Sequence, residues 1–200
     1  MRSTLGMFAL LSMAHGHATF QQFWIDGVDQ GSTCARLPPG NSPIEDVASN
    51  NLRCNIGGAS GVAGICEVPA GSMIEVEMHE QPGDRDCEKP AIGGNHHGPV
   101  MVYLAAVPDA TIADGSDPFF KIGEIPETCL WRLLGPRRGY SLHSAGQLGA
   151  AQFYMTCYQI KVTNGGSASI PSGDHPGIHI NIWVDDIDAY VIPGPPIAEI

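Results

Sequence analysis

The chain has 200 residues, of which 10 are basic and 21 are acidic, so its formal net charge is −11. This acidity argues against nucleic acid or an anionic membrane surface as a partner, whereas a neutral ligand such as a polysaccharide is compatible with it. The length suits a single domain with its own hydrophobic core.

Residues 1–16 have the features of a secretory signal peptide. Arg2 precedes a short apolar run at 5–13, and small residues stand before a cleavage point that would leave His17 as the first residue. A cut two residues earlier would instead expose His15, and cleavage rules alone do not choose between the two. No later segment reaches transmembrane length, so we expect a soluble, secreted product.

Short apolar runs separated by turn signals follow the signal peptide, and long stretches of helical periodicity are absent. Turns are indicated at Asp26-Gly27, at Pro82-Gly83-Asp84 and at Asn164-Gly165-Gly166. This pattern predicts an antiparallel β-sandwich formed by one domain over residues 17–200. The Pro-rich stretch 192–197 is expected to be an extended tail. The predicted strands cover 20–25, 73–78, 100–107, 151–162 and 178–184.

Six cysteines in an exported chain indicate disulfide bonds. No two of them have the CxxC spacing, so a zinc–thiolate site is not expected. Their pairing stays open on this reasoning. They are Cys34, Cys54, Cys66, Cys87, Cys129 and Cys157.

Two histidine features could hold a metal. His17 at a new N-terminus would offer its α-amine and its ring Nδ1 to one ion, and His96-His97 stand near the middle of the chain. One further imidazole would complete a T-shaped set of three nitrogens, which suits copper in either common oxidation state. Each feature alone is weak evidence, because either can arise by coincidence.

The segment 151–157 adds a third feature. On a strand, Gln152 and Tyr154 share one face, while Phe153 and Met155 share the other. The first face could present an amide and a phenol to a site, although a plain core tyrosine with an incidental glutamine is the commoner situation.

Together these residues resemble the fungal lytic polysaccharide monooxygenases of auxiliary activity family 9. The resemblance runs in order over nearly the whole chain after residue 16, and it favours cleavage before His17. It implies an immunoglobulin-like or fibronectin III-like β-sandwich with long loops and a flat active-site face. The similar motifs include His17-Ala-Thr-Phe-Gln, Asn41-Ser-Pro-Ile, Leu52-Arg-Cys-Asn, Asn95-His-His-Gly-Pro, Phe119-Phe-Lys-Ile, Leu142-His-Ser-Ala, Gln152-Phe-Tyr-Met-Thr-Cys, Pro176-Gly-Ile-His and Tyr190-Val-Ile-Pro-Gly-Pro-Pro.

The resemblance assigns roles to individual residues. His17, through its amine and ring, and His96 would bind one copper ion, with the phenol of Tyr154 in the axial position. His143 and Gln152 match the outer-sphere pair that hydrogen-bonds the oxygen co-substrate, so their loss should impair rate more than copper affinity.

Four more residues take their roles from the same resemblance. His97 would be structural. Cys54 and Cys157 match the principal disulfide of the family. Tyr190 matches an aromatic residue on the flat face, where a sugar ring can stack on it.

The activity implied by the resemblance is oxidative cleavage of cellulose or related β-glucans. An external electron donor, either a small reductant or a secreted redox enzyme, would reduce the copper. O2 or H2O2 would then react there, and hydroxylation at C1 or C4 would break the glycosidic bond. We expect a monomer with no nucleic-acid or membrane partner.

Residues 125–140 depart from the family pattern. A long connection is missing, and Gly135-Pro136 with Arg137-Arg138 stand where a strand is expected and would break a β-ladder. We hypothesise a frame error, since plausible codons for residues 130–140 shifted by one base restore the family motif. An intact in-frame transcript would contradict this hypothesis. A shorter gap follows Pro171.

Three alternatives compete with this interpretation. A non-catalytic secreted copper-binding protein could share the fold, and a damaged gene product could be inactive. A hydrolytic glycosidase would need two paired carboxylates, and the acidic residues show no such pair. The sequence does not indicate C1 or C4 selectivity, the preferred glucan or methylation of His17.

Overall fold

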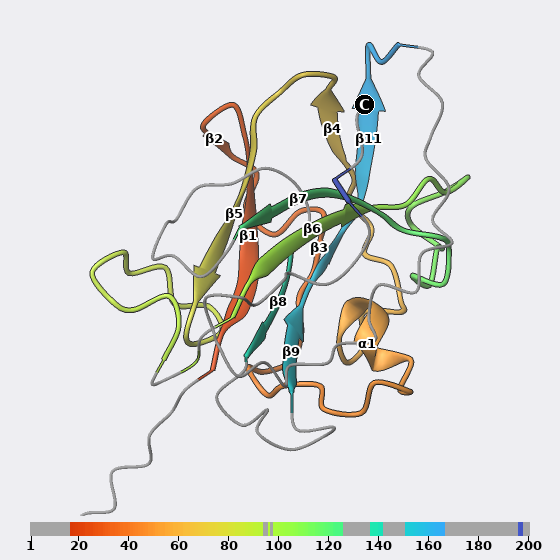
Figure 1. Ribbon diagram of the computed structural model, residues 1–200. Helices are drawn as coiled ribbons and strands as arrows, with labels where there is room; N and C mark the ends of the chain where they lie inside the picture. Colours follow the sequence, from red (N-terminus) through yellow and green to blue (C-terminus); the bar gives the residue numbers. More distant parts are fainter. Residues whose placement is uncertain are drawn as a thin grey trace, which may run out of the picture.

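The computed structural model describes residues 17–93, 96, 98–125, 137–141, 151–166 and 196–197. Strands dominate these residues, and the helix α1 (Asn51–Cys54) is short (Figure 1). No helix in the described part of the chain is long and apolar enough to cross a membrane. The strands are β1 (Thr19–Ile25), β2 (Val28–Asp29), β3 (Ala35–Arg36), β4 (Cys66–Pro69), β5 (Ile74–His79), β6 (Val100–Leu104), β7 (Phe120–Ile125), β8 (Arg137–Ser141), β9 (Gln152–Met155), β10 (Cys157–Tyr158) and β11 (Ile160–Thr163).

Two larger sheets form the body of the molecule. One has the order β2-β1-β5 and the other the order β7-β6-β8-β9, and all their pairs are antiparallel. The pairs β10-β3 and β11-β4 extend the structure at the far end of β9. The all-β class predicted from the sequence is confirmed. The pair β11-β4 is parallel, and this one pair departs from the antiparallel prediction.

The sequence pattern of β1 explains its place. Phe23 and Ile25 point into the core, while Trp24 between them faces outward. The strand ends at Ile25, and Asp26 and Gly27, with φ angles of 48° and 77°, form a two-residue hairpin turn into β2. Asp-Gly is favoured there because both positions need a positive φ.

Two buried clusters lie on opposite faces of β9. Tyr154 packs with Phe20 and Phe23 of β1, so the two larger sheets face each other across this cluster. Phe153 and Met155 point the other way and pack under α1 and the loop before it, against side chains that include Ile44, Leu52, Met101 and Tyr103. The predicted two-faced character of the 152–155 strand is confirmed, and it places Tyr154 between the sheets.

The predicted strand over 151–162 is divided into three. The hydroxyl of Thr156 donates to the carbonyl of Phe20 (2.8 Å), and the amide of Gln159 bonds to loop carbonyls at 62 and 64. The chain therefore changes its pairing partner at these points, from β8 to β3 and then to β4. The strand predicted at 100–107 ends at Leu104, and the one predicted at 178–184 lies outside the described residues.

The prediction that Arg137-Arg138 would break a β-ladder is wrong, while Gly135-Pro136, named in the same prediction, lie outside the described residues. β8 begins at Arg137 and pairs with both β6 and β9, including Val102 opposite Arg137 and Met155 opposite Arg138. Ladder bonds are made by backbone groups, which arginine possesses like any residue except proline. Backbone groups of β6 and β9 are thus paired despite the unusual local sequence.

Two disulfide bonds join the layers. Cys54 of α1 is bonded to Cys157 of β10, the pairing that the resemblance implied. Cys34 is bonded to Cys66, a pairing that the sequence left open. Cys87 is a free, exposed thiol, and Cys129 lies outside the described residues.

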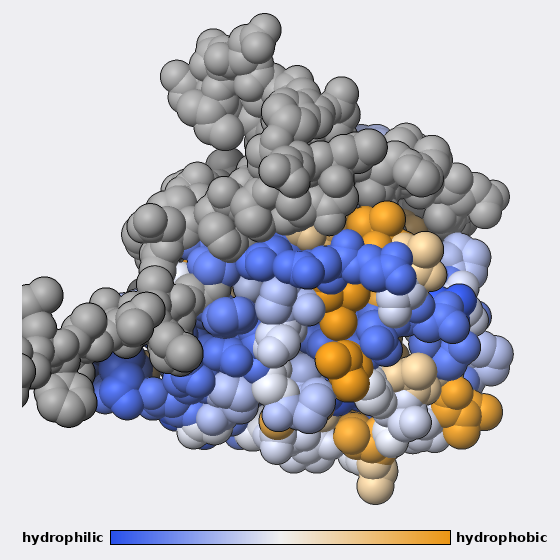
Figure 2. Space-filling view, turned by 90° about the horizontal axis from the view of Figure 1, so that it is seen from below, coloured by the Kyte–Doolittle hydropathy of each residue, from blue (hydrophilic) through white to orange (hydrophobic). Residues whose placement is uncertain are grey.

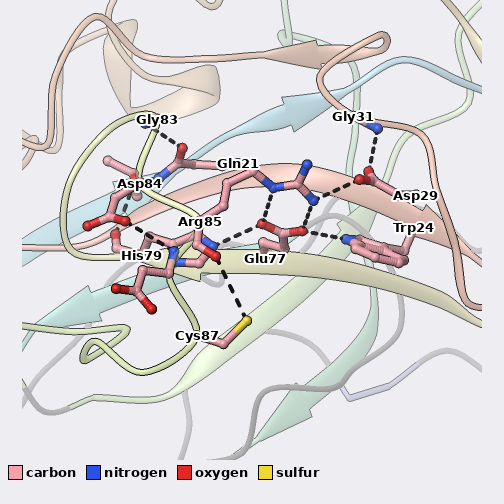
Figure 3. A network of polar contacts seen from close by, with 12 residues as sticks. Gln21, Trp24, Asp29, Gly31, Glu77, His79, Gly83, Asp84, Arg85 and Cys87 are labelled. Atoms are coloured by element: carbon pink, nitrogen blue, oxygen red, sulfur yellow. Dashed lines mark hydrogen bonds and ion pairs between the residues drawn. The ribbon is translucent and has the colours of Figure 1, made fainter.

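A polar network covers the outer face of β1 and β5 (Figure 3). Glu77 accepts hydrogen bonds from Trp24 Nε1 (2.8 Å), His79 Nε2 (2.9 Å) and Arg85 Nε (3.0 Å). Arg85 also donates to Asp29 Oδ2 (2.8 Å). Burial raises the pKa of Glu77, but the hydrogen bonds that it accepts outweigh this effect, so the pKa lies below its ordinary value.

Candidate metal centre

The site lies at the end of the sandwich where β1 and β9 begin, the lower end in Figure 1. His17 immediately precedes the buried residues Ala18 and Thr19, so the core fixes the chain next to it. The carbonyl of His17 accepts a hydrogen bond from Gly93 N (3.1 Å). This bond holds the segment that leads to His96 beside the start of β1.

Three rings gather at this point. The ring centroids of His17 and His96 are 5.6 Å apart, and those of His17 and Tyr154 are 6.2 Å apart. The rings of His96 and Tyr154 meet edge to face with a centroid distance of 5.9 Å. Residues 17, 96 and 154 are remote in sequence, so the fold assembles the two imidazoles and the phenol that the sequence analysis selected.

The side chain of Gln152 connects these rings to the protein surface. Its Oε1 accepts hydrogen bonds from Tyr154 Oη (3.2 Å) and His96 Nε2 (3.2 Å). Its Nε2 donates to Glu45 Oε1 (3.0 Å). Gln152 lies two residues before Tyr154 on the same face of β9, and this spacing brings the amide and the phenol together.

Tyr154 is buried, with 4% of its surface exposed. Burial, and to a smaller extent the negative charge of Glu45, raise the pKa of the Tyr154 phenol above its ordinary value. The phenol is therefore protonated at neutral pH, so it can donate its proton to Gln152.

The nitrogen atoms of the two histidines fit a copper ion. His17 Nδ1 is buried without a hydrogen-bond partner among the described residues, and His96 Nδ1 is buried as well. A buried polar atom without a partner is costly, and a metal ion would satisfy it. No group of three or more His, Cys, Asp or Glu side chains in the described part of the chain could hold a metal. A third nitrogen would have to be the α-amine of His17, which exists only after residues 1–16 are removed.

Several predicted site residues cannot be placed. His143, His97 and Tyr190 lie outside the described residues. Conversely, the sequence analysis missed Glu45, which contacts Gln152 across the site. Only its position directly after Ile44 in a family-like motif could have drawn attention to it, because the pairing of Ile44 with β9 is not visible in the sequence.

The sequence is similar to known families and proteins over most of its length. The family model described as Auxiliary Activity family 9 (formerly GH61) matches residues 17–129 and 139–190. An AA9 family lytic polysaccharide monooxygenase E of Botryotinia fuckeliana is 44% identical over 225 residues, which cover 98% of this chain and 97% of that protein. An AA9 family lytic polysaccharide monooxygenase B of Thermothelomyces thermophilus is 43% identical over 228 residues, covering 94% of this chain and 70% of that protein.

Solved structures share the fold. The structure titled CvAA9A matches with a TM-score of 0.72 and 27% identity, covering 91% of this chain and 98% of that one. A cellulose-active polysaccharide monooxygenase from M. thermophila matches with a TM-score of 0.67 and 23% identity, covering 91% of this chain and 99% of that one.

Proposed function

The chain belongs to Auxiliary Activity family 9, and on that premise we propose that it is a secreted, copper-dependent lytic polysaccharide monooxygenase. It cleaves glycosidic bonds in cellulose or related β-glucans by oxidation at C1 or C4. The observation that carries this proposal is the meeting of His17, His96 and Tyr154 at one end of the sandwich.

The copper ligands are the amine and ring of His17 together with the imidazole of His96. When bound there, copper supplies one-electron redox chemistry and the activation of O2 or H2O2. The buried ring nitrogen of His17 is free of other hydrogen bonds among the described residues, so no competing bond has to be broken before it binds.

The neighbouring side chains control the surroundings of the ion. Tyr154 would place a neutral phenol beside the ion, and its hydroxyl donates to Gln152 Oε1 (3.2 Å). The carbonyl oxygen of Gln152 faces the site, so it can accept a hydrogen bond from a protonated oxygen species such as H2O2 held there. We propose that His143 shares this role. Such outer-shell groups act on rate more than on metal affinity.

The substrate is a polysaccharide surface rather than a single small molecule. Figure 2 views the end of the molecule seen from below, where the described residues are largely hydrophilic with separate hydrophobic spots. A hydrophilic surface suits a crystalline glucan, which cannot enter a deep pocket. Tyr190 contributes an aromatic ring on which a sugar can stack.

Export and partners follow from the same proposal. Residues 1–16 are a signal peptide, and their removal creates the amine of His17 that binds copper. The mature protein, residues 17–200, acts as a monomeric single domain outside the cell. It receives electrons from a small reductant or a secreted redox enzyme and uses O2 or H2O2.

A non-catalytic copper-binding protein is the alternative function. It is the weaker candidate because metal storage has no need for the hydrogen bonds that join Gln152 to Tyr154 and His96. An inactive product of a damaged gene model is the other alternative, and the pairing of β8 with both β6 and β9 argues against it.

The test is the release of oxidised oligosaccharides from cellulose by the mature, copper-loaded protein with ascorbate. We expect C1- or C4-oxidised products that require ascorbate and copper, and none from His17→Ala. Copper binding without oxidised products would support the non-catalytic alternative. Product release without copper or reductant would indicate a hydrolase instead.

A further inference from the structure

The loop before α1 is fixed to the strand that carries the site. Ile44 pairs with Phe153 of β9 in an antiparallel bridge, in which Ile44 N donates to Phe153 O (2.9 Å) and Phe153 N donates to Ile44 O (3.0 Å). The side chains of both residues are buried in one cluster. In an antiparallel pair, the residue after Ile44 stands opposite the residue before Phe153. Glu45 is therefore placed opposite Gln152 by the backbone alone.

The contact between these two side chains has a defined direction. A carboxylate can only accept hydrogen bonds, so the NH2 group of Gln152 must face Glu45. The distance from Gln152 Nε2 to Glu45 Oε1 is 3.0 Å. The carbonyl oxygen of the same amide is then turned toward Tyr154 Oη (3.2 Å). Rotating the amide by half a turn would set its oxygen against the carboxylate and its NH2 group against the phenol.

We propose that Glu45 is a positioning residue that fixes the amide orientation of Gln152 and thereby directs its carbonyl oxygen at the metal centre. This role in the reaction rests on the proposed function, while the orientation itself does not. Glu45 touches the site through its hydrogen bond to Gln152. Its negative charge also raises the pKa of the Tyr154 phenol, which stays protonated at neutral pH with or without that charge.

The expected size of the effect follows from the exposure of the pair. Glu45 is exposed, so the hydrogen bond competes with water. Losing a residue that hydrogen-bonds a group next to a metal costs about 10- to 100-fold in metal affinity or activity. For an exposed residue such as Glu45 we expect a loss near the smaller of these two values. We therefore expect about a tenfold loss of turnover in Glu45→Ala, with a smaller loss in Glu45→Gln, whose amide permits both orientations of Gln152.

The chain offers a matched control. Asp46 follows Glu45 in the same loop and is also exposed, but its Oδ1 accepts from Ala48 N (2.9 Å). Glu45→Gln and Asp46→Asn each exchange one carboxylate for an amide. They change the net charge equally, and only the first alters the partner of Gln152.

The first measurement needs no copper. The side-chain NH2 resonances of Gln152 are recorded by NMR in the copper-free mature protein and in both variants. We expect Glu45→Gln to shift or split these resonances and Asp46→Asn to leave them in place. Resonances unchanged in Glu45→Gln would overturn the proposal, whatever the activity of the protein.

The second measurement uses the copper-loaded protein. Glu45→Ala should lower turnover while the Cu(II) dissociation constant stays within about threefold, because no ligand is touched. In a Gln152→Ala background, Glu45→Ala should cause no additional loss, since the two residues act as one unit. An equal loss in both backgrounds, or full turnover in Glu45→Ala, would overturn the role of Glu45 in the reaction.

If the unaltered protein binds copper but oxidises nothing, the proposed function fails. The NMR result still decides whether Glu45 fixes the amide orientation of Gln152.

Discussion

At the scale of single residues, Tyr154 belongs both to the core and to the site. Its ring packs with Phe20 and Phe23 between the sheets, while its hydroxyl reaches Gln152 at the edge. The sequence could predict which face of the strand Tyr154 occupies, because alternation alone decides it. The contact of Gln152 with Glu45 could not be predicted, since it depends on the backbone pairing of a distant loop.

The substitution Tyr154→Phe tests what the hydroxyl group of Tyr154 contributes to stability, copper affinity and turnover. The substitution keeps the ring in the core and removes the hydrogen bond to Gln152, so the free energy of unfolding should fall by about 1 kcal/mol. Cu(II) affinity should change by less than about threefold, while turnover on cellulose should fall about tenfold or more. Urea unfolding, copper titration and product assays measure the three quantities. Loss of copper binding would show that the phenol is a strong ligand instead of a neighbour of the ion.

Glu77 makes stability depend on pH. Burial raises its pKa from the ordinary 4.5, but hydrogen bonds from Arg85, His79 and Trp24 outweigh this and lower the pKa. A carboxyl with a lowered pKa stabilises the folded state above its unfolded pKa, and this stabilisation disappears as the pH falls through the folded value. Glu77→Gln should therefore lower the unfolding free energy by about 2 kcal/mol at pH 7.

The difference in unfolding free energy between Glu77→Gln and the unaltered protein should become smaller below pH 4.5, the ordinary pKa of this carboxyl. Denaturant unfolding at a series of pH values measures it. The control is Glu67→Gln, which breaks an exposed ion pair with Lys161 and should have no measurable effect. A difference that stays constant down to pH 3 would contradict the assigned charge state.

At the scale of elements, the segment from β9 to β11 organises the molecule. It pairs in turn with β8, β3 and β4, and it carries Cys157, which is bonded to α1. The strands near 20–25 and 73–78 were predictable from apolar alternation. The division of 151–162 was not, because it results from hydrogen bonds of Thr156 and Gln159 to distant parts of the chain. β8 was missed because its ladder bonds are independent of side-chain type.

The two disulfides should differ in their contribution to stability. Cys54–Cys157 closes a separation of 103 residues and Cys34–Cys66 one of 32. A cross-link stabilises mainly by reducing the entropy of the unfolded chain, so the longer loop should contribute about 5 kcal/mol and the shorter about 4.

Guanidinium unfolding of Cys54→Ala/Cys157→Ala and Cys34→Ala/Cys66→Ala measures the two contributions separately. We expect the first pair of substitutions to destabilise the protein more. A larger loss from removing Cys34–Cys66 would mean that native packing around that bond outweighs loop entropy.

At the scale of the whole molecule, the fold brings the first residue of the mature chain to the histidine near its middle. The β-sandwich class followed from many short strands with turns between them. The family followed from motifs spread over nearly the whole chain, and its model matches on both sides of residues 130–138. The geometry of the centre could not be derived from spacing, because residues 17, 96 and 154 meet only through tertiary packing.

The central claim is that the amine and ring of His17 hold copper together with His96. Electron paramagnetic resonance of the mature protein with one equivalent of Cu(II) tests it directly. We expect a single type of copper with three nitrogen donors, lost in His17→Ala. The spectrum should also change when Gly16 is retained before His17, because that keeps the ring but converts the His17 amine to an amide. A spectrum unchanged by either alteration would contradict the account.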